Sequence, residues 1–194
     1  MPRRILCLHG YTQDGSILRA KMGALRKAFN KQTEFIYLNA PFKAMDENGV
    51  QNGFAFWNPK GDILNDIEAS LTYIHDFIQS NPPFDGVIGF SQGSSIITLY
   101  QFKYKHAFKF AIVISASKSV SALTINKEPC KIKSPCLHIC GDNDDICSAT
   151  TSSAYMTTYY DDISFLKHGG GHGMPLDKES KLNIKAFIES HFTQ

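Results

Sequence analysis

Short, almost continuously apolar runs recur along the chain, separated by segments with helical periodicity. Such runs are typical of parallel strands covered on both faces. They are too short for a membrane span, which takes about 20 apolar residues. The predicted strands are 4–8, 34–38, 86–90, 110–114, 136–140 and 163–167. Their alternation with helices predicts an α/β fold, a doubly wound, mostly parallel sheet of about six strands with helices on both faces.

Apolar residues three and four positions apart predict the helices. One face of the first helix carries Leu18, Met22, Leu25 and Phe29. The second helix carries the stripe Ile63, Ile67, Leu71, Ile74 and Ile78, and Asp62 before it is a predicted N-cap. Further helices are expected to begin near Gln92, near Ser148 and near Asp177.

Two stretches, 39–61 and 115–134, have no clear period. Long connections in a compact domain are often functional walls or lids. The aromatic residues of the first stretch either pack on the edge of the sheet or line a pocket, and the sequence leaves both interpretations open. We expect residues 1–194 to form a single domain without a separate cap domain.

Charge and cysteine usage narrow the function class. The chain has 20 Lys plus Arg against 18 Asp plus Glu, a net charge of +2. This balance lacks the basic face expected of a nucleic-acid-binding protein. The 5 cysteines are odd in number and lack CxxC spacing, which predicts buried thiols in a reducing compartment and a cytosolic location.

The strongest motif is Gly89-Phe90-Ser91-Gln92-Gly93, which matches G-x-S-x-G where a predicted strand turns into a predicted helix. In that context the strained turn projects the serine hydroxyl above the sheet, and the helix N-terminus stabilises negative charge beside it. We therefore predict Ser91 as a nucleophile. The competing interpretation is a Gly/Ser turn without chemistry.

A serine nucleophile needs a base and an acid, which in this fold class follow in the order acid, then histidine. After the fifth predicted strand come Asp142, Asp144 and Asp145, and spacing alone leaves the choice among them open. After the sixth come His168 and His172. Because His172 lies on a glycine loop able to reach over the sheet, we predict it as the base and His168 as structural.

The first strand ends at His9-Gly10, a sequence suited to an oxyanion hole. The predicted donors are the backbone N–H groups of Tyr11 and Gln92. Motifs for bound groups fail: Ser16 stands where a phosphate loop needs lysine. The strand 136–140 spreads its Cys and His over about 13 Å, too far for one zinc ion. We predict neither a metal nor a cofactor.

Taken together, these motifs resemble the α/β-hydrolase superfamily and, within it, the FSH family of serine hydrolases, which includes relatives of the animal ovarian-cancer-associated hydrolase. The resemblance covers nearly the whole chain. It rests on Leu8-His9-Gly10-Tyr11-Thr12-Gln13, Gly23-Ala24-Leu25-Arg26-Lys27, Asn39-Ala40-Pro41, Ala55-Phe56-Trp57, Gly89-Phe90-Ser91-Gln92-Gly93 and His168-Gly169-Gly170-Gly171-His172.

By position, the resemblance implies Ser91 as nucleophile, Asp144 as acid and His172 as base. It implies hydrolysis of carboxylic esters without a cofactor, in the cytosol and also the nucleus. Ser148 departs from the proline usual after the acid, which bears on how the acid loop is set.

The resulting hypothesis is a serine esterase that acts through an acyl-enzyme on a small-molecule acyl ester. Phe54, Phe56 and Trp57 are predicted to line the acyl pocket. The alternatives are an acyl thioesterase with the same triad and a non-catalytic hydrolase-fold protein that binds a small ligand. The oligomeric state is not readable from the sequence.

Overall fold

The computed structural model describes residues 2–29, 33–46, 48–81, 83–116, 131–175 and 177–192. Its main sheet comprises β1 (Arg3–Leu8), β2 (Thr33–Leu38), β5 (Gly86–Phe90), β6 (Phe110–Ile114), β7 (Cys136–Gly141) and β8 (Ile163–His168). The strand order is β2-β1-β5-β6-β7-β8, and all neighbours are parallel. Each strand matches its predicted range to within one residue at either end.

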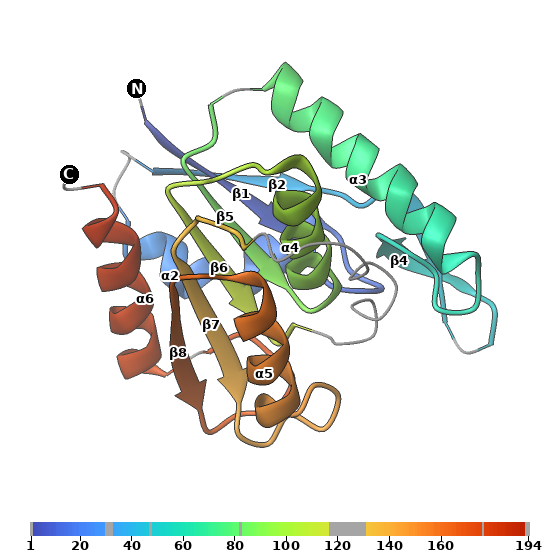
Figure 1. Cartoon of the computed structure of the whole chain (residues 1–194). Coiled ribbons are helices and arrows are strands. Elements are labelled where there is room, and N and C mark those ends of the chain that lie inside the picture. The colour runs from blue at the N-terminus through green and yellow to red at the C-terminus, as the bar shows by residue number, and fades with distance from the viewer. Residues whose placement is uncertain are drawn as a thin grey trace.

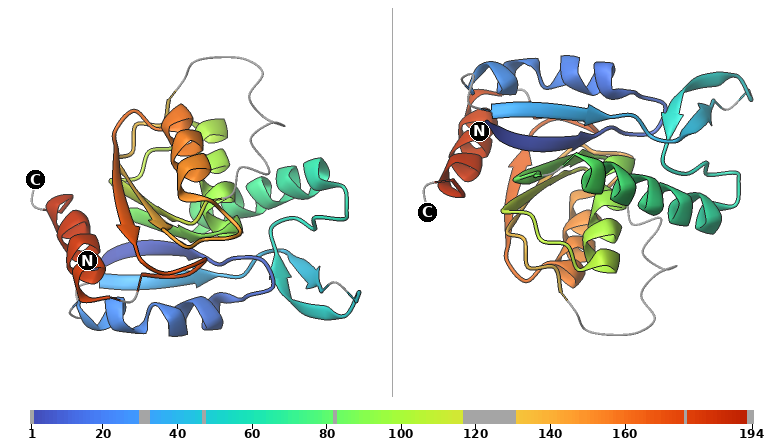
Figure 2. Two further views of the ribbon diagram at one scale, coloured as in Figure 1. Left: turned by 90° about the horizontal axis from the view of Figure 1, so that it is seen from below. Right: turned by 90° about the horizontal axis from the view of Figure 1, so that it is seen from above.

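Helices cover both faces of this sheet, as predicted (Figures 1 and 2). They are α1 (Gly15–Lys21), α2 (Gly23–Lys27), α3 (Ile63–Ser80), α4 (Gln92–Tyr104), α5 (Ala149–Tyr159) and α6 (Lys178–Ser190). Leu6 and Leu8 of β1 pack with α3, α4 and α5, whereas Ile5 and Cys7 pack with α1, α2 and α6. The alternation of strand side chains thus separates two hydrophobic clusters.

Short polar side chains begin four of the helices. The side chains of Asp14, Asp62, Ser148 and Asp177 accept hydrogen bonds from backbone N–H groups in the first turns of α1, α3, α5 and α6. Each of these residues supplies an acceptor for an N–H group that has no partner within the helix. The predicted helix starts are confirmed.

The prediction of one long first helix is wrong. Met22 has φ −81° and ψ 6°, which ends α1, and α2 starts at the following Gly23. Leu18, Met22 and Leu25 are nevertheless buried together, while Phe29 lies beyond α2 and packs against the cluster. The buried apolar face is therefore continuous across the break between α1 and α2, and for this reason the apolar pattern does not predict the break.

The stretch 39–61, which has no clear period, contains an antiparallel hairpin of β3 (Phe42–Met45) and β4 (Gln51–Ala55). We call residues 42–46 and 48–57 the hairpin segment. It lies beside the first turns of α3 (Figure 1) and contacts the loop after β1 through a bridge between Gln13 and Phe54. Of the second stretch, residues 117–130 lie outside the described residues.

The strand order reverses between β1 and β5, because β2 lies on one side of β1 and β5 on the other. Ligands of open α/β sheets bind at such a switch point, outside the carboxyl ends of the strands. The turns after β1, β5, β7 and β8 meet at this edge. Within the described part of the chain, no helix has the length and apolar character needed to span a bilayer.

Candidate active site

Ser91 occupies a sharp turn between β5 and α4. Its φ of 51° and ψ of −116° are a strained combination for a residue with a side chain, costing about 1–3 kcal/mol. A Cβ on Gly89 would lie 2.6 Å from the Gly93 carbonyl oxygen, and one on Gly93 would lie 2.2 Å from that of Leu8. Glycine is therefore required on both sides of the serine.

A hydrogen-bonded relay joins Ser91 to two side chains from distant turns. The His172 Nε2 lies 2.9 Å from the Ser91 Oγ, and the His172 Nδ1 lies 2.9 Å from the Asp144 Oδ2. The Phe90 ring packs beside the imidazole, with ring centroids 5.3 Å apart. Of the three acidic candidates left open by spacing, Asp144 is the one that reaches His172.

The Asp144 carboxylate is held by the loop that follows β7. Its Oδ1 accepts hydrogen bonds from the backbone N–H groups of Ile146 at 3.0 Å and Cys147 at 2.7 Å. Burial raises the pKa of this carboxyl, but the Cys147 N–H, the Ser115 hydroxyl and His172 favour the charged form, and the net pKa lies below the usual value. An ionised carboxylate therefore faces the imidazole.

The other candidates at these loops do not reach the relay. Asp142 and Asp145 are exposed, and Asp142 lies 3.8 Å from the Lys167 ammonium. His168 is buried at the end of β8, where its Nδ1 accepts from the Gly170 N–H. That placement fits the structural part predicted for His168.

The loop after β1 runs directly beside the serine turn. A Cβ on Gly10 would lie 3.2 Å from the Ser91 Cβ, so the adjoining Tyr11 peptide is close to the nucleophile. The Tyr11 hydroxyl donates to the Met45 carbonyl at 2.6 Å, which ties this loop to the hairpin segment. Gln92 is the first residue of α4, so its backbone N–H belongs to the free first turn of that helix.

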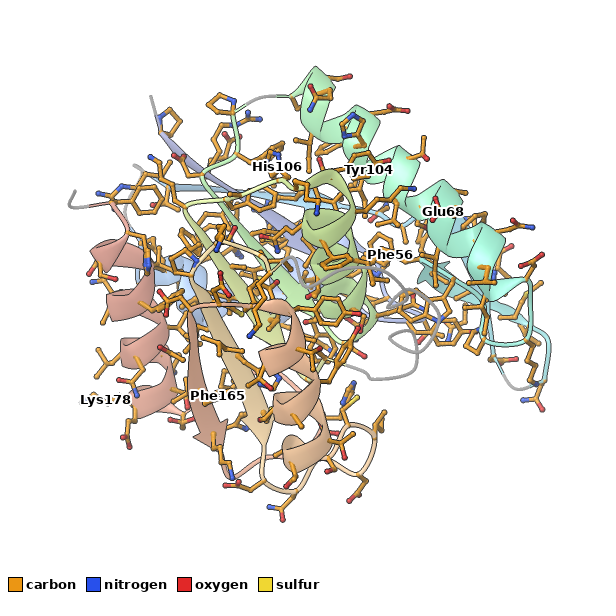
Figure 3. All side chains as sticks on the ribbon, viewed as in Figure 1. Phe56, Glu68, Tyr104, His106, Phe165 and Lys178 are labelled. Atoms are coloured by element: carbon orange, nitrogen blue, oxygen red, sulfur yellow. The ribbon has the colours of Figure 1, made fainter. Side chains whose placement is uncertain are left out.

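The predicted acyl-binding aromatics differ in their burial. Phe56 and Trp57 are 0% and 5% exposed and pack into the core (Phe56 is labelled in Figure 3). Phe54 is half-buried, with the Lys43 ammonium 4.0 Å from its ring centroid. Their role in binding an acyl chain stays a prediction, and Phe54 retains the most accessible surface.

Two cavities adjoin this edge of the sheet. One, of about 470 Å³, is lined by Tyr11, Met45, Asp46, Asn58, Pro59, Lys60 and Gly61. The other, of about 760 Å³, lies between the glycine loop of His172 and the first turn of α6. Both volumes are in the range of small-molecule sites, about 300–1,000 Å³.

One group in the described residues has metal-ligating atoms gathered together: those of Asp144, Cys147 and His172 lie within 4.8 Å of one another. Two of these side chains already bond to each other in the relay. A zinc ion would need both of them at about 2.0–2.2 Å. It would therefore have to displace the hydrogen bond between Asp144 and His172.

The sequence analysis assigns no role to the side chains of two polar residues next to the serine, Ser94 and Gln92. The Ser94 Oγ accepts from the Ile114 N–H at 2.8 Å and donates to the Gly89 carbonyl at 2.7 Å, which joins the turn to β6. The Gln92 side chain bonds twice to the hairpin segment. The only signal available was polarity in an otherwise buried helix.

The parallel sheet and the relay are the arrangement expected of a serine hydrolase, and sequence comparison supplies the family. A family model described as serine hydrolase (FSH1) matches residues 1–184, so the chain belongs to this family. It is 30% identical to an esterase of Caenorhabditis elegans, covering 95% of this chain and 92% of the relative. It is 27% identical to Esterase OVCA2 of Danio rerio, covering 97% of each chain.

Solved structures support the fold assignment. Acyl-protein thioesterase 2 of Zea mays superposes with a TM-score of 0.75 at 16% identity, covering 98% of this chain and 94% of the other. A carboxylesterase of Bacillus cereus gives 0.74 at 16% identity, covering 98% and 89%. The expected α/β-hydrolase fold is confirmed.

Proposed function

We propose that the protein is a serine esterase in which Ser91, His172 and Asp144 form the catalytic triad. The observation that carries this proposal is the continuous relay of 2.9 Å contacts from the Ser91 Oγ through the imidazole to the carboxylate. Family membership supports the reaction class. The esterase names of the curated relatives support carboxylic esters as substrates.

In the proposed mechanism, His172 Nε2 takes the Ser91 proton while the Oγ attacks the ester carbonyl. The Asp144 carboxylate accepts a hydrogen bond from the Nδ1–H of His172 and stabilises the imidazolium. His172 then protonates the departing alcohol, leaving an acyl-enzyme. Water, deprotonated by His172, attacks the acyl carbon, and the released Ser91 alkoxide regains the proton. Every proton is carried by Ser91, His172, water or the alcohol.

The backbone N–H groups of Tyr11 and Gln92 are the proposed donors to the oxyanion. Their support is location: the Tyr11 peptide adjoins Gly10 beside Ser91, and the Gln92 N–H starts α4. Losing one such donor typically costs about 2.7–4 kcal/mol of transition-state stabilisation. The cavity lined by Tyr11 and Met45 is our proposed site for the organic part of a small acyl ester.

Intact-mass analysis after treatment with an alkyl fluorophosphonate tests the nucleophile. We expect one adduct on the native chain, peptide mapping of that adduct to Ser91, and no adduct on Ser91→Ala. The matched control Ser16→Ala removes an exposed serine and should label like the native chain. An equal adduct on Ser91→Ala would exclude the proposed nucleophile.

A substrate panel tests the esterase assignment. Nitrophenyl esters from acetyl to decanoyl should show a clear maximum in kcat/KM, because an apolar site gains free energy with each buried methylene. Matched ester and thioester substrates measure the preference between the two linkages. Absence of turnover on the whole panel, with a native ligand retained, would favour a binding protein.

A further inference from the structure

The Gln92 side chain forms a two-way clamp on the hairpin segment. Its Oε1 accepts from the Phe56 N–H at 2.7 Å, and its Nε2 donates to the Trp57 carbonyl at 2.7 Å. Gln92 is only 4% exposed. A primary amide can accept and donate at once, so this one side chain pairs the Phe56 N–H and the Trp57 carbonyl, which lie directly after β4.

Phe56, whose backbone is bonded to the Gln92 side chain, also contacts His9. Its carbonyl accepts from the Ser70 Oγ of α3 at 2.6 Å, so its backbone is held from two helices. Its ring packs on the imidazole of His9, with centroids 5.4 Å apart and planes 33° apart. Both residues are fully buried.

His9 in turn fixes the direction of one peptide group. Its Nε2 accepts from the Ala40 N–H at 3.0 Å, which assigns the ring proton to Nδ1, 2.8 Å from the Gly10 carbonyl. Burial lowers the pKa of His9, which keeps this tautomer neutral. The Gln13 N–H also donates to the Gly10 carbonyl.

That carbonyl belongs to the same planar unit as the Tyr11 N–H. In a trans peptide the C=O and N–H point in opposite directions. Two hydrogen bonds that hold the Gly10 oxygen therefore also aim the Tyr11 N–H away from His9. A path of contacts consequently runs from the Gln92 amide, through Phe56 and His9, to the proposed first oxyanion donor.

We propose that the Gln92 side chain is a positioning group that holds the two oxyanion donors, the N–H of Tyr11 and its own N–H, at a fixed separation. The inference rests on the proposed function. It assigns to one residue two separable tasks: the backbone donates to the oxyanion, and the side chain sets where the other donor lies.

A purely structural clamp makes a different prediction from a positioning clamp. Unpairing the Phe56 N–H and the Trp57 carbonyl lowers the stability of the folded protein in both cases, because each group is then buried without a partner. Only the positioning clamp lowers kcat in fully folded protein. Because the oxyanion forms only after attack, KM should change little.

The test compares Gln92→Met with Gln101→Met. Gln101 lies in the same helix at 1% exposure and donates to the Tyr160 hydroxyl, so its replacement also removes a buried amide. At temperatures where circular dichroism shows both variants folded, we expect kcat to fall about 10²-fold for Gln92→Met, the effect of a displacement near 1 Å. KM should stay within about twofold for both variants, and kcat of Gln101→Met should match the native value to the same extent.

An alkyl trifluoromethyl ketone, which adds to serine as a tetrahedral oxyanion, supplies the second readout. Its inhibition constant should rise in Gln92→Met by the same factor as kcat/KM falls. If Gln92→Met does not fold, Gln92→Glu keeps the size of the side chain and replaces it in both assays. Native kcat and native affinity for the ketone in the folded variant would overturn the inference, whereas an unlabelled Ser91 in native protein would overturn the proposed function.

Discussion

The two halves of the carboxyl edge of the sheet are built differently. On one side, which we call the triad half, the proposed triad residues Ser91, Asp144 and His172 lie on turns that follow β5, β7 and β8. On the other side, which we call the hairpin half, the hairpin segment packs on the loop after β1 and is held by side chains that bond to its backbone. The triad half inherits its geometry from the sheet, and the hairpin half depends on specific polar contacts.

This difference has a consequence for mutational sensitivity. In the triad half, substitutions should affect the chemistry while leaving the fold intact. In the hairpin half, they should affect stability and the oxyanion site together, because Phe56 serves both the core and the contact with His9. Four experiments separate these expectations.

The largest expected effect is that of Asp144→Asn on turnover. The amide presents an N–H donor to His172 and favours the wrong imidazole tautomer, so kcat should fall about 10⁴-fold. The fold should persist, because the change is isosteric. Steady-state kinetics and a melting curve measure the two quantities.

The neighbouring exposed residue provides the control. Asp145→Asn removes the same charge from the same loop without touching the relay, and its kcat should stay near the native value. Equal losses in both variants would show that the net charge of the loop, and not the hydrogen bond to His172, supports turnover.

The second effect concerns the stability of the hairpin half. Phe56→Ala deletes a fully buried ring and should lower the free energy of unfolding by about 3–5 kcal/mol. Phe165→Ala removes an exposed ring from β8 (Figure 3) and should change it by less than about 0.5 kcal/mol. Urea titrations measure both values. A small stability loss with an altered acyl-length profile would instead make Phe56 a wall of the substrate pocket.

The triad half is also the half that the sequence predicts best. Continuous apolar runs locate parallel strands because burial on both faces leaves little room for polar side chains. Because the carboxyl ends of parallel strands converge at one edge, the strand assignment also predicts that Ser91 and His172 lie near each other. Spacing alone leaves three candidates for the acid. The choice of Asp144 depends on how the loop after β7 folds back toward His172, which spacing does not predict.

The contacts that hold the hairpin segment are not predicted from the sequence, for a physical reason. The partners of Gln92 are backbone atoms of Phe56 and Trp57, and backbone atoms have no sequence signature. The break at Met22 is similar, because the buried face continues through it. The periodicity of apolar residues predicts which residues are buried. It does not predict the backbone dihedrals or the bonds from side chains to backbone atoms that hold those residues in place.

The third effect is a dependence of stability on pH in the triad half. Burial lowers the pKa of His138 on β7 from 6.5 to about 4, so the unfolded chain binds this proton first as the pH falls. Stability is therefore retained above pH 6.5 and lost between 6.5 and 4, by about 3 kcal/mol from this residue. His138→Gln should flatten the acid limb of unfolding free energy by that amount, as urea titrations at pH 7 and 4 will measure. Burial also lowers the pKa of His9, but His9 is present in both the native protein and His138→Gln, so its contribution cancels when the two unfolding free energies are subtracted. An unchanged acid limb would exclude His138 as its source.

The smallest expected difference separates two glycines of the hairpin segment. Gly49 and Gly53 have φ of 77° and 67°, so alanine at either position pays a left-handed backbone cost of about 1–2 kcal/mol. A Cβ at Gly49 meets nothing within 4 Å, whereas one at Gly53 would lie 2.4 Å from the Thr12 carbonyl oxygen. Gly53→Ala should therefore be less stable than Gly49→Ala by about another 1–3 kcal/mol.

The same pair tests whether docking of the hairpin segment sets the oxyanion site. To relieve its clash, Gly53→Ala must move away from the loop 10–13 and strain the 2.8 Å bond from the Phe54 N–H to the Gln13 carbonyl. That loop carries Tyr11, so kcat should fall in Gly53→Ala and stay native in Gly49→Ala, each measured on folded protein. If both variants keep native kcat, the loop after β1 holds its own geometry and the two halves of the edge are independent.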